Sequence, residues 1–149
     1  MNSSSVGRLG FAALLAIAAT SDADAKPRPN TLLLGDLGDG SKLWLMQDSV
    51  RQDESAIRHG WTIIDYPAPQ TTQGVEYRSD ASKFYVKCQS QEITLANAIK
   101  FDGAMGGGKN VFQVNSEPTP EPVAADYHPV RPNTAEQVVA SAICKQKIR

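Results

Sequence analysis

Apolar side chains recur at every second position in several short segments of this chain. The clearest segment covers residues 83–89, in which Phe84, Val86 and Cys88 alternate with more polar neighbours. A period of two places alternate side chains on opposite faces of a β-strand. Similar strand-like runs occur at residues 42–47, 61–66, 74–79, 93–101 and 111–115. Because turn residues separate them, the pattern predicts five or six antiparallel strands in a meander.

Three details refine this prediction. Residues 42–47 are apolar on both faces, which is typical of a central strand. Pro67 and Pro69 are expected to end the strand at residues 61–66, since proline cannot donate to a ladder. Residues 93, 95, 99 and 101 share parity, so Ile93, Leu95, Ile99 and Phe101 are expected on one face, with Asn97 as the exception.

The C-terminal region has the only helical pattern. Ala135, Val138, Val139 and Ala142 are spaced as one stripe of a half-buried helix. Two capping arrangements precede it, Asn133 with Glu136 or Thr134 with Gln137. The sequence therefore predicts an α+β domain, a small antiparallel sheet with a C-terminal helix packed on it.

The N-terminus has the features of a secretory signal peptide. An apolar run at residues 9–19 follows Arg8, and the small residues Ala23 and Ala25 precede Lys26. Eleven apolar residues are too few for a membrane span, which needs about 20. We expect residues 1–25 to be removed by cleavage between Ala25 and Lys26, followed by an extended arm at 26–41 and a single domain at 42–149.

Export predicts the state of the two cysteines. Cys88 and Cys144 are the only pair, and thiols of exported proteins are normally oxidised. A structural disulfide is expected between a buried strand position and the edge of the helical stripe. A redox or metal pair is the alternative, but there is no Cys-x-x-Cys, and His59 and His128 lack ligand spacing.

The balanced charge of the chain excludes partners that are recruited by long-range electrostatic attraction. Without the leader the chain has 14 basic and 14 acidic side chains, so no basic field for nucleic acid exists. No catalytic signature stands out, and neither a cofactor nor a metal is expected. Asp65, within an apolar strand, is interpreted as a structural carboxylate paired with Arg78 or a tyrosine hydroxyl; a tuned acid is the alternative.

A glycine-rich segment resembles a phosphate-binding loop. Residues 103–109 match G-x-x-x-x-G-K, but Asn110 replaces the Ser or Thr that would bind Mg²⁺, and a strand rather than a helix follows. We therefore interpret Gly103–Lys109 as a hairpin turn.

The spacing of these features resembles the surface-adhesin protein E-like domain family of proteobacterial envelope proteins. The matching residues, between about Leu43 and Cys144, are Tyr77-Arg78-Ser79, Cys88, the turn at Gly106–Gly108, Pro132-Asn133-Thr134-x-Glu136 and Cys144. The resemblance implies a small antiparallel sheet with a C-terminal helix that is joined to it by a disulfide bond between Cys88 and Cys144. It also implies a homodimer and binding of extracellular-matrix or plasma proteins.

These observations predict an exported, non-enzymatic binding module. Its partner would be an extracellular or envelope protein, bound through an exposed strand edge or sheet face. The protein is expected in the periplasm or outside the cell without a lipid anchor, since no cysteine lies near the cleavage point. A periplasmic housekeeping or stress protein without an extracellular ligand is the first alternative, and a small hydrolase is the second.

Overall fold

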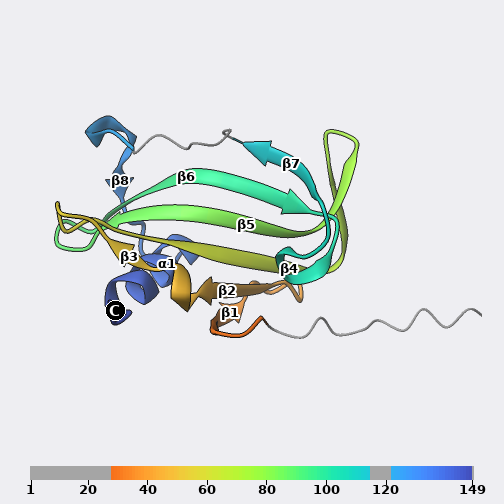
Figure 1. Cartoon of the computed structure of the whole chain (residues 1–149), viewed down its shortest axis with the longest axis horizontal. Helices are drawn as coiled ribbons and strands as arrows, with labels where there is room; N and C mark the ends of the chain where they lie inside the picture. Colours follow the sequence, from red (N-terminus) through yellow and green to blue (C-terminus); the bar gives the residue numbers. More distant parts are fainter. Residues whose placement is uncertain (1–27, 115–121, 149) are drawn as a thin grey trace, which may run out of the picture.

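The computed structural model describes residues 28–114 and 122–148. It contains one antiparallel sheet whose main path has the order β1-β2-β4-β5-β6-β7, with α1 packed against one face (Figure 1). Since neighbouring strands follow one another along the chain, the sheet is the predicted meander. The predicted α+β class is confirmed.

The strands are β1 (Thr31–Asp36), β2 (Lys42–Met46), β3 (Arg51–Gln52), β4 (Arg58–Thr72), β5 (Val75–Lys87), β6 (Glu92–Phe101), β7 (Asn110–Val114) and β8 (His128–Pro129). The helix is α1 (Ala135–Lys145), and short 3-10 turns occur at η1 (Gln47–Ser49), η2 (Ala104–Gly106) and η3 (Ala124–Asp126). The two-residue strands β3 and β8 pair with β4 and β6.

The main core lies between α1 and the sheet. We call the side of the sheet that α1 covers the helix face. The fully buried members of this core are Leu43, Leu45, Val50, Val86, Ile93, Val139, Ala140 and Ile143. Gly60 of β4 lies beneath the helix, where an added Cβ would come within 3.1 Å of Val50 and 3.5 Å of Ile143. A glycine at this position therefore permits the close approach of α1 to the strand.

Two predicted strand boundaries are wrong. Pro67 and Pro69 do not end their strand, because β4 continues to Thr72. Its pairing with β5 is interrupted between Asp65 and Gln70, so the prolines lie where no ladder hydrogen bond is needed. The runs at residues 74–79 and 83–89 belong to one strand, β5, since residues between them pair with β4 and β6 on both sides.

The shared face expected for residues 93–101 is also wrong. Ile93 and Leu95 lie opposite Val86 and Phe84 on the helix face. A bulge in the β5–β6 pairing follows, and Lys83 is opposite Asn97. The extra residue reverses the alternation, so Ile99 and Phe101 lie on the opposite face together with Asn97.

The helix begins with the second of the two expected capping arrangements, Thr134 with Gln137. Thr134 is the N-cap and accepts a hydrogen bond from the Gln137 backbone N–H at 3.4 Å. The buried stripe, however, consists of Val139, Ala140 and Ile143, whereas Ala135 and Val138 are exposed. The stripe is thus rotated from the predicted one, and of the four predicted residues only Val139 belongs to it.

Candidate interaction surface

The first strand forms an edge of the sheet. Residues 31–36, part of the segment assigned to an extended arm, form β1, and among the described residues β1 pairs with β2 alone. Leu32 is 43% exposed and Leu33 is 49% exposed. Because successive strand residues point to opposite faces, the edge presents a leucine on each. Apolar edge strands with free backbone groups are sites at which another extended chain can pair.

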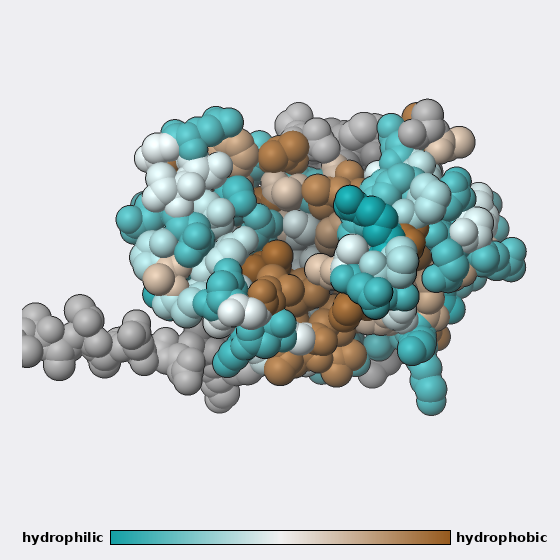
Figure 2. Space-filling view, turned by 180° about the vertical axis from the view of Figure 1, so that it is seen from behind, coloured by the Kyte–Doolittle hydropathy of each residue, from teal (hydrophilic) through white to brown (hydrophobic). Residues whose placement is uncertain are grey.

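Exposed and half-buried apolar side chains also occur farther along the helix face, on the other side of the buried Leu45 and Thr62. The strand register places Leu32 opposite Leu45, and further pairs lead through Thr62, Ser82 and Ala98 to Val114. Leu95 is 50% exposed and Val114 is 47% exposed. Figure 2 shows apolar residues gathered in the middle of this face, with polar residues on either side. We define the apolar band as Leu32, Ile64, Phe84, Leu95, Ala98 and Val114.

A polar cluster lies beside the band. Lys100 donates to Asp80 across the β5–β6 pair at 2.6 Å, and its ammonium lies 4.1 Å from the centre of the Tyr77 ring. Burial by itself would lower the pKa of Lys100, but the hydrogen bond and charge of Asp80 outweigh it and raise the pKa. Tyr66 packs edge-on against Tyr77 at 5.6 Å. The cluster is thus a satisfied ion pair beside two phenols that pack edge to face, rather than a reactive group.

The phenol of Tyr66 should resist ionisation. Burial first, and the nearby Asp80 carboxylate second, raise its pKa above the ordinary value of about 10. Above that pH the unfolded chain loses this proton while the folded chain keeps it, so stability falls as pH rises. The slope should be less than about 1.4 kcal/mol per pH unit, because the side chain is half-buried. Absorbance titration at 295 nm should show the most alkaline tyrosine step, which Tyr66→Phe removes; persistence of that step would contradict the assignment.

A polar cavity of about 410 Å³ opens at the start of β1. Its lining contains two cations, Arg51 and Lys147, one carboxylate, Asp48, and the amides of three further side chains. The complete lining is Asn30, Gln47, Asp48, Val50, Arg51, Gln146 and Lys147. The cavity therefore lies where η1 and the C-terminal end of α1 meet the N-terminal end of the edge strand.

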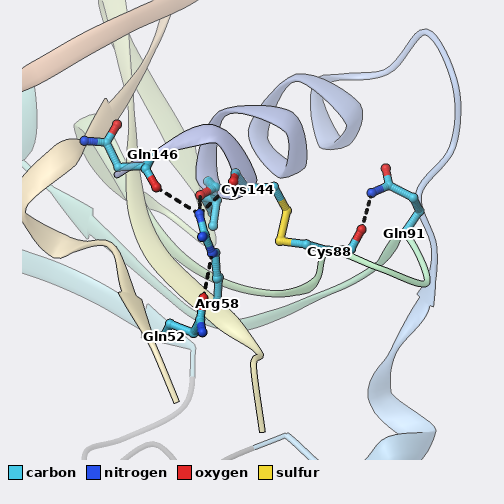
Figure 3. The surroundings of a disulfide bond; sticks show 7 residues. Gln52, Arg58, Cys88, Gln91, Cys144 and Gln146 are labelled. Atoms are coloured by element: carbon cyan, nitrogen blue, oxygen red, sulfur yellow. Dashed lines mark hydrogen bonds between the residues drawn. A yellow bond between two sulfur atoms is a disulfide. The ribbon is translucent and has the colours of Figure 1, made fainter. Parts of the chain in front are cut away.

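The predicted disulfide is present. Cys88 and Cys144 are bonded, with their Cα atoms 5.8 Å apart, and they tie the end of β5 to the last turn of α1 (Figure 3). Beside this bond, the Arg58 side chain donates to the carbonyls of Cys144 and Gln146 at 2.6 and 2.9 Å. The covalent bond and the guanidinium together fix the C-terminal end of the helix on the sheet. The expected cleavage site, Ala25–Lys26, lies outside the described residues.

Asp65 and the glycine-rich turn meet on the face opposite α1. The Asp65 carboxylate accepts from the Met105 backbone N–H at 2.7 Å, so its partner is neither Arg78 nor a tyrosine hydroxyl. Ser79 donates to the Gly103 carbonyl and accepts from the Gly106 N–H. Gly103–Lys109 connects the antiparallel strands β6 and β7, as the hairpin interpretation requires. Three backbone amides of this turn, those of Met105, Gly106 and Lys109, donate to the protein's own side chains.

The histidines lie in different surroundings. The His59 ring packs 4.9 Å from that of Tyr85, and His128 Nε2 lies 3.2 Å from Glu136 Oε1. Within residues 28–114 and 122–148, no group of three His, Cys, Asp or Glu side chains is arranged to hold a metal ion. Nor does this part of the chain contain a helix long and apolar enough to cross a membrane.

A family model for surface-adhesin protein E matches residues 32–145. The chain belongs to this family. The resemblance inferred from the sequence is therefore confirmed, and the match begins inside β1 rather than at Leu43. No curated protein matches this adhesin-family chain.

Solved structures of protein E from Haemophilus influenzae share the fold. Crystal form II has a TM-score of 0.56 at 14% identity, with 78% of this chain and 88% of that chain covered. Protein E from non-typeable Haemophilus influenzae gives 0.56 at 14% identity, covering 84% and 85%. At such low identity the similarity establishes the architecture of this adhesin-family chain and carries no residue-level role.

The sequence did not identify the residues of this surface. Leu32 and Leu33 lie in the segment assigned to the arm, and three consecutive leucines before Gly35 were the available signal. Arg51 and Lys147 are far apart in sequence and meet only because α1 folds back onto the start of the sheet. The expected use of a sheet face or strand edge for binding stays a prediction for this adhesin-family chain.

Proposed function

We propose that this chain is an exported adhesin-type protein that binds another protein, without catalysis, through the β1 edge and the adjoining apolar band. The mature protein begins at Lys26 and acts in the periplasm or outside the cell. Its partner is an extracellular or envelope protein. Family membership supports the adhesin type, and the structural neighbours share the fold.

The exposure of leucines on both faces of an edge strand is the observation that carries this proposal. Sheet edges are usually protected by charged side chains, proline or short length. Strand β1 has six residues, TLLLGD, with neither lysine nor proline among them. An accessible apolar edge of this kind can add an extended strand of a partner protein through main-chain hydrogen bonds.

Site-specific photocrosslinking in the producing cells tests the proposal. A photoreactive phenylalanine analogue replaces Leu32 in the full chain with its leader, and the matched control carries it at Gln73, which is exposed at the tip of the β4–β5 hairpin. We expect a protein adduct from position 32 and none from position 73. Leu33→Lys should reduce that adduct roughly tenfold, because a paired apolar edge would have to accommodate a charge.

Equal adducts from both positions, or none from position 32, would overturn the proposed edge. The fraction that contains the adduct also separates the two main interpretations. Adducts in the medium or at the cell surface support the adhesin type, whereas adducts confined to the periplasm support a periplasmic housekeeping protein.

A further inference from the structure

Only part of the β1 edge is regular enough to accept another strand. The register with β2 is continuous from Thr31 to Leu33 and is interrupted by a bulge before Gly35. The Asn30 carbonyl accepts from the Gln47 N–H at 2.9 Å and so points toward β2. Because pairing alternates along an antiparallel strand, the backbone groups of Thr31 and Leu33 point outward. Within residues 28–114 and 122–148, the regular, unpaired part of the edge therefore adjoins Asn30.

The polar cavity lies at that same end. The Arg51 guanidinium is held there by bonds from Nη1 to the carbonyls of Asp48 and Val50, at 2.6 and 2.8 Å. The Asp48 carboxylate accepts from the Asn30 side-chain amide. Lys147 also lines the cavity, which therefore contains two cations and one carboxylate, that of Asp48. The described lining of the cavity thus carries one net positive charge.

The other end of β1 has the opposite charge. Asp36 and Asp39 accept from the backbone amides of Gly38 and Ser41, both at 2.8 Å, in the turn that leads to β2. Lys42 lies opposite Asp36 and offsets one of the two carboxylates. Charge thus changes sign along the strand, from positive at Asn30 to negative at Asp36–Asp39. Such polarity can select the direction of a bound chain.

Building on the proposed function, we infer that β1 binds an extended partner segment in the antiparallel direction. The segment has apolar side chains at alternate positions, a basic residue beside Asp36 and Asp39, and an acidic side chain that enters the cavity beside Arg51 and Lys147. The antiparallel direction follows from pairing stability, since parallel pairs are slightly weaker, and the charges then fix which end of the segment is basic and which is acidic.

A second copy of this chain fits the same edge less completely. If two β1 strands paired antiparallel about Leu33, the second copy would reach the Asn30 end at its own Asp36, so its carboxylates also match the charge at that end. Its chain turns back there, as the Leu37 N–H to Ser41 carbonyl bond at 2.9 Å shows. It would leave the cavity beyond Asn30 unfilled. A free extended segment continues past this point, and we therefore assign the edge to another protein.

Two peptides of identical composition test the direction. Acetyl-KTVTLTVTE-amide has the inferred polarity, and acetyl-ETVTLTVTK-amide has the reverse. Binding of each fluorescent peptide to the mature, disulfide-bonded chain is measured by anisotropy. We expect the first to bind roughly fivefold more tightly, with the preference fading at high salt, because the charges are partly exposed. Lys147→Glu should abolish or reverse the preference, whereas Lys109→Glu, at an exposed position just before β7, should leave it unchanged.

The outcomes separate this inference from the proposed function. If both peptides bind within twofold of each other and Leu33→Lys weakens both, the edge stands and the polarity is wrong. If Leu33→Lys weakens neither, the proposed edge itself fails. A wild-type dimer in analytical ultracentrifugation that Leu33→Lys converts to monomer would assign the edge to a second copy and overturn the inference. An equal loss of preference in Lys147→Glu and Lys109→Glu would also contradict it.

Discussion

Replacing Cys88 and Cys144 together by serine should lower the free energy of unfolding by about 4 kcal/mol. The two residues are 56 apart in sequence, so their bond removes much of the conformational freedom of the unfolded chain. A single small domain has only about 5–15 kcal/mol in total, and the loss is a large fraction of it. Urea unfolding followed by the fluorescence of Trp44 and Trp61 measures the change.

Loss of the disulfide should loosen α1 more than the rest of the fold. Cys144 lies in the last turn of α1, and hydrogen exchange should therefore speed up in α1 before it does in the central strands β4 and β5. Wild-type protein reduced with dithiothreitol is the matched control and should unfold at the same urea concentration as the serine variant. A serine variant within about 1 kcal/mol of the oxidised wild type would contradict the prediction.

The predictable parts of this fold were those with a local periodic signal. The alternation of Phe84, Val86 and Cys88 correctly placed the cysteine on the face that α1 covers. Capping residues before Ala135 located the start of the helix, because the hydrogen bond from Gln137 to Thr134 is itself local. Two cysteines in an exported chain left a single pairing to consider.

The parts that failed depend on contacts between distant segments. A bulge has no reliable sequence signal, so the reversal of faces between Leu95 and Asn97 was not foreseeable from parity. Strand β1 was missed because an edge strand with an exposed leucine on each side shows no alternation. The cavity at Asn30 depends on where α1 ends, which follows from tertiary packing and not from local propensity.

The C-terminal end of α1 depends on one cation. Arg58 Nη1 lies 3.3, 2.6 and 2.9 Å from the carbonyls of Ile143, Cys144 and Gln146, and Arg58 Nε donates to Gln52 at 3.1 Å. Figure 3 shows this side chain beneath the last turn of the helix. Carbonyls at a helix C-terminus lack intrahelical partners and carry partial negative charge, so a guanidinium is favourable there on both counts.

Arg58→Ala should therefore lower the free energy of unfolding by about 2 kcal/mol, since Nη1 can donate two charge-assisted bonds and the carbonyls lose both. Arg58→Lys should recover about half, because an ammonium keeps the charge at the helix end and loses the planar fork. Arg131→Ala is the matched control: its side chain is 72% exposed beside Glu136, and its loss should cost less than about 0.5 kcal/mol. Urea titration measures all three variants. If Arg58→Ala and Arg131→Ala changed stability equally, the cation beneath α1 would be an ordinary surface charge, and the disulfide and the buried Ile143 would hold the helix end on the sheet without it.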